Sequence, residues 1–505
     1  MPAPRRRATP GALAAVAAVA AIALASPAGA QPPRPVYDRV ILGGRVIDPE
    51  SGLDATRNVG IVGGRIGVVT AAPIRGRDTL DARGLVVAPG FIDLHAHGHD
   101  DESYGYYAMD GVTTALELEL GVWPVSRFYA ERDGRSRVNY GGAVAHAGAR
   151  RWTVGEETAG WSTLGQDTRT RWSHTPTTPA LLDSVRTALA RGLDEGALGI
   201  GIGIAYTPAA SAREIYRVFE LCAERRVICF THLRTGGLAG LQEVLTDAIG
   251  TGASLQIVHV NSTGGAEAGL MLRVIRRARE HGVDVTAEAY PYTASSTALQ
   301  SPIFDSTEAR VARGEMRFED LVWVATGEHL TAETYRKRRA EGGFVVWLDA
   351  MPDSAVTLAL ADSTVMIASD AVPFVNHRGH PRLAGTFARV LGRYVREQRA
   401  LSLPEAIRRM TYLPARRMEA SVPQLRTKGR LRAGADADVT VFDPARVIDR
   451  ATVEEPAQFS GGIVHVLVNG TPVVRGERLV DGAVPGRAIR RGRAGATVGA
   501  RRAGS

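Results

Sequence analysis

Short β-branched runs, punctuated by glycine, occur near both ends of the chain. They are typical of short strands and lie at Tyr37–Ile47, Asn58–Thr70, Thr79–Val87, Ala437–Phe442 and Ile463–Val468. Strands that precede and follow a central domain can pair when its two ends lie close together. We therefore predict a small β-sandwich domain formed by both chain ends, over residues 31–88 and 426–484.

Between these ends, apolar strand-like runs alternate with amphipathic helical segments. Helical periodicity is clear at Pro179–Arg191, Ser211–Arg225, Gly265–His281 and Leu403–Arg409. Alternating βα units predict an α/β fold with a parallel sheet, here a (β/α)8 TIM-like barrel over residues 89–425. Residues 306–343 are charged and helical in pattern, and they lie between two strand candidates. We predict that they form an insertion that caps the site.

The first 30 residues have the pattern of a secretory signal. Arg5–Arg7 precede the apolar run Ala12–Ala25, and small residues precede Gln31. We predict a signal peptide over residues 1–30, cleaved after Ala30, and a periplasmic or secreted protein. A retained membrane anchor is the alternative, but the run is shorter than the ~20 residues that span a bilayer. No later segment is long and apolar enough to span one.

Composition and charge narrow the class of protein further. The 505 residues are 45% hydrophobic and 23% charged, which is typical of a globular chain. The net charge of +8 comes from the two ends, which hold nine of the 61 basic residues and no acid, so the body has 52 basic against 53 acidic side chains. A near-neutral body argues against nucleic-acid binding. The arginine-rich residues 485–505 are predicted to be a disordered tail.

The two cysteines are Cys222 and Cys229, seven residues apart across a predicted helix-to-strand turn. We predict packed free thiols, with a disulfide as the alternative in an oxidising compartment.

Histidines stand at the ends of several predicted strands. His95 and His97 end an apolar run and are two residues apart, so both can point into a barrel. His232, His259 and Asp370 end three further runs. The carboxyl ends of barrel strands converge on one point, where imidazole and carboxylate groups can share a divalent ion.

Several motifs extend this pattern along the chain. They are PGFIDLHAH at 89–97, GVTT at 111–114, EGALGIGIGIAYTP at 195–208, THLR at 231–234, IVH at 257–259, AYPYTASST at 289–297, ASDAVP at 368–373 and HPRL at 380–383. With them the chain resembles the metal-dependent amidohydrolase superfamily, and within it the N-acyl-D-amino-acid deacylases, or D-aminoacylases. The resemblance implies a hydrolase of non-peptide C–N bonds that deacylates a small-molecule amide, an N-acyl-D-amino acid.

The resemblance also implies the metal ligands. His95 and His97 would bind one ion position, His232 and His259 the other, and Asp370 would be both a ligand and the proton carrier. The expected cofactor is a divalent metal, Zn2+ first, as one or two ions.

The bridging ligand departs from the family pattern. No lysine precedes Lys337, which excludes the carboxylated lysine of many relatives, and Leu120 stands where the most similar deacylases have a cysteine. Glu117 and Glu119 share a strand face opposite the leucines, and a buried carboxylate needs a partner. We predict that Glu119 bridges, with Glu117 as the alternative bridge or as a partner of a ligand histidine. A glutamate paired with an interior arginine is the remaining alternative. A carboxylate in place of a thiolate also permits Mn2+, Co2+ or Fe2+.

For the substrate carboxylate, the resemblance implies Arg382, Tyr290 and Ser296. A salt bridge beneath the cap is the alternative role for Arg382. Asn261 stands where D-aminoacylases carry a lysine, which leaves the preferred acid side chain open. Hydrolysis of another amide, such as a dipeptide, a cyclic amide or an amide toxin, is therefore a second candidate function. A third candidate is a metal-binding barrel without catalysis, against which the four histidines and Asp370 argue.

Overall fold

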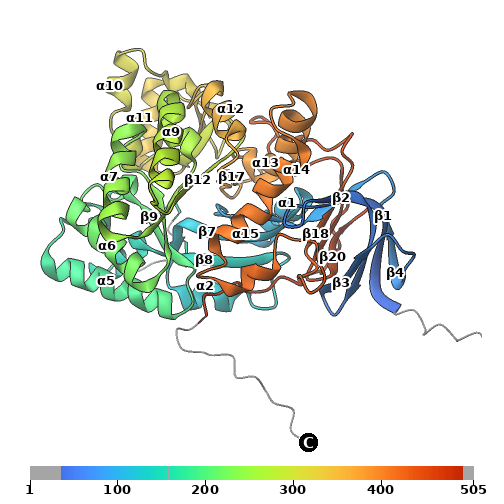
Figure 1. Ribbon diagram of the computed structural model, residues 1–505. Helices are drawn as coiled ribbons and strands as arrows, with labels where there is room; N and C mark the ends of the chain where they lie inside the picture. Colours follow the sequence, from blue (N-terminus) through green and yellow to red (C-terminus); the bar gives the residue numbers. More distant parts are fainter. Residues whose placement is uncertain (1–35, 157–159, 163, 166, 493–505) are drawn as a thin grey trace, which may run out of the picture. The chain divides into compact units, whose positions relative to one another are not determined.

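The computed structural model describes residues 36–492, apart from 157–159, 163 and 166 (Figure 1). All elements below belong to one compact unit that begins at Val36. The predicted signal peptide lies outside the described residues.

Eight parallel strands form a nearly closed barrel. In hydrogen-bonding order they are β6 (Phe91–Asp93), β7 (Val112–Val122), β8 (Asn139–Ala145), β9 (Gly199–Gly203), β10 (Ile228–His232), β11 (Ser254–Ile257), β12 (Val285–Ala289) and β17 (Val365–Ile367). Beyond β6 and β17 the chain pairs across the remaining gap, where the His97 amide donates to the Ala371 carbonyl at 2.9 Å. The predicted TIM-like barrel is confirmed.

Helices follow the strands and cover the barrel (Figure 1). The main ones are α1 (Asp101–Met109), α2 (Val125–Arg132), α3 (His146–Thr153), α5 (Pro179–Asp194), α6 (Ala212–Arg225), α7 (Gly237–Thr251), α9 (Ala268–Glu280), α12 (Asp353–Ala361), α13 (Arg382–Arg389), α14 (Leu403–Met410) and α15 (Tyr412–Met418). In α6, Ser211 caps the first turn by accepting the Glu214 amide, and Ile215, Val218 and Phe219 face the core.

Both chain ends contribute to a separate sheet. Its strands are β1 (Val36–Asp48), β2 (Leu53–Val62), β3 (Arg65–Thr70), β4 (Arg75–Asp81), β5 (Val86–Pro89), β18 (Val439–Phe442), β19 (Ile463–Val468) and β20 (Thr471–Arg475). β18 pairs antiparallel with β5 and so joins the two ends of the chain. The prediction that both chain ends together form a separate β structure is confirmed.

The segment between β12 and β17 carries a small sheet of its own. It contains β13 (Ser295–Ala298), β14 (Leu321–Trp323), β15 (Glu328–His329) and β16 (Phe344–Trp347), with helices α10 (Thr307–Ala312) and α11 (Ala332–Glu341). We call residues 295–347 the cap. The predicted insertion, 306–343, lies inside it, but the first and last strands of the cap fall outside those bounds.

The C-terminal segment packs on the barrel further than its composition predicts. Ile489 is 1% exposed, its carbonyl accepts the Tyr129 hydroxyl at 2.7 Å, and Arg490 lies over the Tyr129 ring. The prediction of disorder is therefore wrong for residues 485–492, because an apolar anchor interrupts the arginines. Residues 493–505 lie outside the described residues.

Cys222 and Cys229 form a disulfide, with Cα atoms 6.2 Å apart. The prediction of free thiols is wrong because Arg226, in a left-handed conformation at the end of α6, turns the chain back and brings β10 beside the helix.

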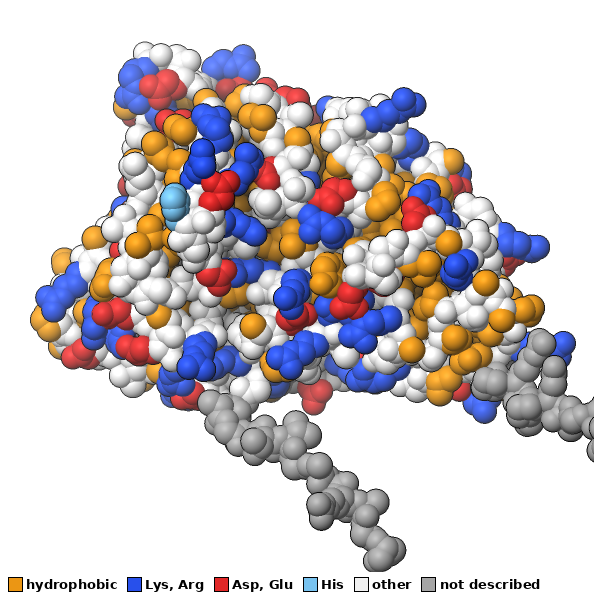
Figure 2. Space-filling model, in the orientation of Figure 1, with side chains coloured by type: hydrophobic (Ala, Val, Ile, Leu, Met, Phe, Trp, Pro, Cys, Tyr) orange, Lys and Arg blue, Asp and Glu red, His pale blue; other side chains and the backbone are white. Residues whose placement is uncertain are grey.

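The surface agrees with a near-neutral body: Figure 2 shows basic and acidic side chains interspersed over the face in view. Within the described residues, no helix has both the length and the apolar character needed to cross a membrane.

Candidate metal centre and active site

Four histidines and two carboxylates meet at the C-terminal ends of the barrel strands. His95 and His97 follow β6, Glu119 lies in β7, His232 ends β10, and His259 and Asp370 lie just beyond β11 and β17. Each side chain is at a strand end because the preceding residues are apolar and buried in the barrel, which fixes the direction of the strand. The structure thus brings together all six side chains predicted as metal ligands.

Glu119 lies at the centre of this group. Its Oε2 is 3.0 Å from His95 Nε2 and 3.3 Å from His97 Nε2. Its Oε1 is 2.6 Å from His232 Nδ1 and 2.9 Å from His259 Nε2. One carboxylate oxygen therefore faces each pair of histidines. Burial alone would raise the pKa of Glu119, but the neighbouring histidines hold that pKa well below its usual range.

Asp370 stands beside the first pair. Its Oδ1 is 3.4 Å from Nε2 of both His95 and His97, and its Oδ2 is 2.9 Å from Arg382 Nη1. Burial raises the pKa of Asp370, and the Arg382 guanidinium and His95 outweigh this effect and lower it. Asp370 is therefore an ionised carboxylate that can accept a proton.

The donor set fits a divalent metal. Two groups offer ligand atoms that lie within 4.8 Å of one another, His95, His97, Glu119 and Asp370 in one and Glu119, His232 and His259 in the other. Buried carboxylates outnumber the single arginine beside them, and a cation would balance this charge. Imidazole and carboxylate ligands suit zinc and the neighbouring transition metals.

Two further carboxylates lie behind the first histidine pair. Glu117 Oε2 is 2.7 Å from His97 Nδ1, and Glu288 Oε1 is 2.6 Å from His95 Nδ1. Each carboxylate can accept the Nδ1 proton, which turns the lone pair of Nε2 toward the site. Glu117 thus takes the predicted alternative place behind a ligand histidine. Sequence reasoning missed Glu288, although a lone acid in the buried strand β12 was a usable signal.

A cavity of about 540 Å³ opens over the cluster. From the cluster it is lined by His97, Glu119, His232, His259 and Asp370. Other walls include Tyr206 and Arg234 from the barrel and Ser296, Ile303, Arg310 and Trp347 from the cap. Residues of the cap therefore form part of the wall of the cavity that holds the metal-ligand cluster.

The predicted substrate-binding residues occupy different depths. Ser296 lines the cavity, and its Oγ has no hydrogen-bond partner in the described part of the chain. Arg382 is 1% exposed and donates from Nη2 to the Ser296 carbonyl at 3.1 Å. Tyr290 is buried with its ring 4.8 Å from the Arg382 guanidinium. Arg382 and Tyr290 thus lie beneath the cavity wall.

Asn261 needs a correction, because it does not line the cavity. Its Nδ2 donates to the Tyr290 carbonyl at 3.0 Å, and its Oδ1 accepts the Tyr290 amide at 3.4 Å. His259 has a left-handed φ of 33°, and a short helix, α8 (Val260–Gly264), follows. This turn points Asn261 toward the backbone after β12 and away from a substrate.

Comparisons with known proteins agree with this geometry. A family model described as "Amidohydrolase family" matches residues 175–474. N-acyl-D-glutamate deacylase from Alcaligenes xylosoxydans xylosoxydans is 34% identical over 90% of this chain and 96% of its own length. D-aminoacylase from the same organism is 31% identical, covering 90% of this chain and 98% of its own.

A crystal structure of N-acyl-D-glutamate deacylase from Bordetella bronchiseptica, complexed with zinc and a phosphonate mimic of the tetrahedral intermediate, superposes with a TM-score of 0.75. It is 30% identical and covers 90% of this chain and 100% of that one. A crystal structure of D-aminoacylase has a TM-score of 0.74 at 26% identity, with the same coverage. This chain belongs to the amidohydrolase family, and within it to the N-acyl-D-amino-acid deacylases.

Proposed function

We propose that the protein is a metal-dependent amidohydrolase that cleaves the amide bond of N-acyl-D-amino acids. The observation that carries this proposal is Glu119, whose two oxygens face two histidine pairs at the floor of a capped cavity beside the ionised Asp370. The relatives named N-acyl-D-glutamate deacylase, N-acyl-D-aspartate deacylase and D-aminoacylase support the same reaction.

In this proposal His95, His97, Glu119 and Asp370 would hold one metal ion, and Glu119, His232 and His259 would hold a second. A divalent ion bound there would lower the pKa of its bound water to about 7 and would polarise the acyl carbonyl. We propose zinc, as in the Bordetella enzyme, with manganese, cobalt or iron as alternatives because Glu119 is an oxygen ligand.

Asp370 is the proton carrier in this mechanism. Its Oδ1 faces the cluster, where it takes the proton of the attacking water, and it then delivers that proton to the leaving amine nitrogen. Arg382 binds Oδ2 and keeps Asp370 ionised, which leaves Oδ1 available to accept the proton.

Ser296 is the predicted carboxylate contact that reaches the cavity. Arg382 and Tyr290 act from beneath, because Arg382 contacts both the Ser296 carbonyl and Asp370 and is stacked on Tyr290. We propose that Ser296 receives the substrate α-carboxylate and that the other two position it.

We further propose that the protein is exported to the periplasm or beyond. The basic, apolar and small-residue regions of residues 1–30 support export. The Cys222–Cys229 disulfide agrees with an oxidising compartment.

The test is amine release from a panel of N-acetyl D- and L-amino acids by zinc-loaded protein. D-isomers should be hydrolysed faster, and Asp370→Asn should lower kcat about 10²- to 10⁴-fold because the proton carrier is lost. Asp353→Asn, at the first turn of α12 and outside the cavity, is the matched control. Equal or faster release from L-isomers, or an unchanged rate for Asp370→Asn, would refute the proposal.

A further inference from the structure

The cap contributes one charged side chain to the described lining of the cavity. Arg310, on α10, stands among the apolar Pro302, Ile303 and Trp347 and several small polar groups. Its guanidinium carbon is 4.7 Å from the centre of the Trp347 ring, which holds the side chain against the cavity wall.

Arg310 lacks a close carboxylate partner. The nearest ion pair is with Glu315, whose Oε2 is 3.8 Å from Arg310 Nε, and the side chain is 25% exposed. Glu315 is already bound by both Arg313 Nε and Nη2. Among the described residues, no hydrogen bond engages the Arg310 guanidinium, so its planar set of donors is free for a ligand.

The other arginine of the cavity is in a different state. Arg234 donates from Nε and Nη2 to Glu243 at 2.9–3.1 Å, and from Nη1 to the Ala210 carbonyl at 2.9 Å. Its charge and its donors are therefore satisfied within the protein. Arg310 is the arginine of this cavity that remains to pair with an anion.

Resting on the deacylase function proposed above, we propose that Arg310 binds a carboxylate on the amino-acid side chain of the substrate. The preferred substrates are then N-acyl derivatives of acidic D-amino acids. The α-carboxylate and the scissile nitrogen are attached to the same carbon, so the α-carboxylate must stay near the metal ligands, where Ser296 is proposed to receive it. Arg310 lies on α10 of the cap, beside Ile303 and Trp347, which offer an apolar surface to the methylene groups that lead to a side-chain carboxylate.

The test compares N-acetyl-D-glutamate with N-acetyl-D-glutamine, which have nearly the same size and the same α-carboxylate. The parent protein should prefer the glutamate derivative. Arg310→Met should lower kcat/KM for that derivative about 10- to 100-fold, mainly through KM, and leave the glutamine derivative nearly unchanged. Arg310→Lys, which keeps the charge but not the fork, should retain part of the preference.

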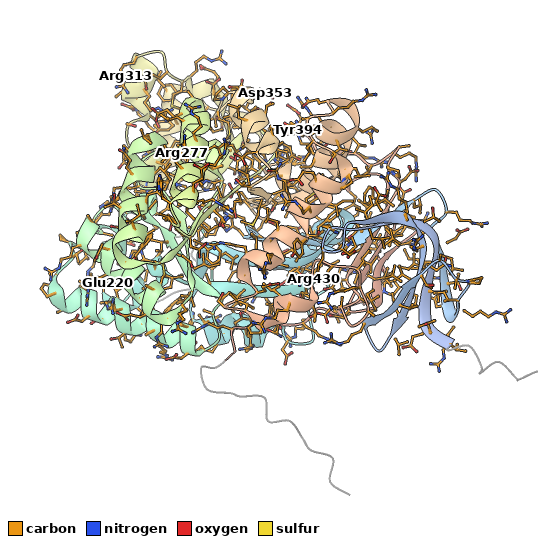
Figure 3. The ribbon with its side chains drawn as sticks, in the orientation of Figure 1. Glu220, Arg277, Arg313, Asp353, Tyr394 and Arg430 are labelled. Carbon is orange, nitrogen blue, oxygen red and sulfur yellow. A yellow bond between two sulfur atoms is a disulfide. The ribbon has the colours of Figure 1, made fainter. Side chains whose placement is uncertain are left out.

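Arg336→Met is the matched control, since Arg336 lies on α11 of the cap, is 64% exposed and pairs with Glu308. Arg313, which lies at the outer tip of the cap in Figure 3, is unsuitable as a control. Its loss would free Glu315 to pair with Arg310. A calorimetric titration of the zinc-loaded protein with D-glutamate and D-glutamine gives a readout independent of turnover, and Arg310→Met should weaken only the D-glutamate binding.

Two results would overturn the assignment. If Arg310→Met lowers kcat/KM equally for both substrates, Arg310 binds the α-carboxylate or stabilises the fold instead. If Arg310→Met lowers kcat/KM for neither substrate while both are hydrolysed, Arg310 does not bind the side-chain carboxylate, although the proposed function stands. If no N-acyl-D-amino acid is hydrolysed, the proposed function fails, and the titration still shows whether Arg310 binds a side-chain carboxylate.

Discussion

At the scale of single residues, Glu119 lies between the two histidine pairs of the site and contacts both. A carboxylate has two oxygens, and the alternation of β7 places one toward each histidine pair. Glu117, two residues earlier, is on the same face but ends behind His97. The two glutamates of one strand therefore have different tasks, one within the ligand group and one that orients a ligand.

This division of roles predicts different metal losses. Glu119→Gln should reduce the number of tightly bound metal ions, because a neutral amide ligates both positions poorly. Glu117→Gln should keep the stoichiometry and weaken metal affinity about 10- to 100-fold, as expected for a residue behind a ligand histidine. Metal content by elemental analysis after dialysis checks both. Unchanged metal in Glu119→Gln together with its loss in Glu117→Gln would reverse the assignment.

Sequence reasoning reached most of this site because strand periodicity is simple. Histidines at strand ends and two glutamates on one face require only a period of two residues. Glu119 was also predicted as the central one, but the partner that each glutamate contacts depends on the stagger of neighbouring strands, which no local pattern encodes. Asn261 was misplaced for a similar reason, since the left-handed His259 starts a new turn and redirects the side chains that follow.

At the scale of elements, the disulfide ties α6 to β10, the strand that ends in His232. It closes a short loop, so it restricts the unfolded chain by a modest amount. We predict that Cys222→Ala/Cys229→Ala lowers the free energy of unfolding by about 2–3 kcal/mol, measured by urea denaturation. Thiol titration of the denatured, unreduced parent should find no free thiols in these two residues, and two thiols would contradict the bond.

A buried ion cluster joins α6 to α3. Glu214 on α6 accepts from Arg150 Nη1 at 2.6 Å, and its other oxygen is 2.8 Å from His146 Nε2. Burial alone would raise the pKa of Glu214, but His146 and Arg150 lower it to about 2 from an ordinary 4.5. Because the folded pKa is the lower one, ionised Glu214 stabilises the fold above pH 4.5, and this contribution is lost as the pH falls toward 2.

Glu214→Gln should therefore cost on the order of 3 kcal/mol above pH 5, and the cost should shrink at lower pH. Urea denaturation of parent and variant between pH 3 and pH 7 measures the difference. Glu224→Gln, on the same helix but 54% exposed and paired with Arg186, is the control and should change stability little. A stability difference that does not vary with pH would show that the carboxylate charge is not what matters.

At the scale of the whole molecule, the order of elements was predictable and several boundaries were not. Alternating strand and helix patterns predicted the barrel, and the β runs at both ends predicted the separate sheet. The predicted insertion, 306–343, is shorter than the cap because β13, Ser295–Ala298, has little apolar alternation and is held by pairing with the distant β16. The predicted disordered tail, 485–505, began too early because one apolar residue, Ile489, is buried against the barrel.

The account as a whole requires that hydrolysis depend on a metal held by the histidine–carboxylate cluster. The most direct measurement is the rate of amine release from the best N-acetyl-D-amino acid by chelator-stripped protein, before and after zinc is added back. The account predicts that stripped protein releases no amine and that zinc restores the rate. Full hydrolysis by protein shown to be metal-free would contradict it.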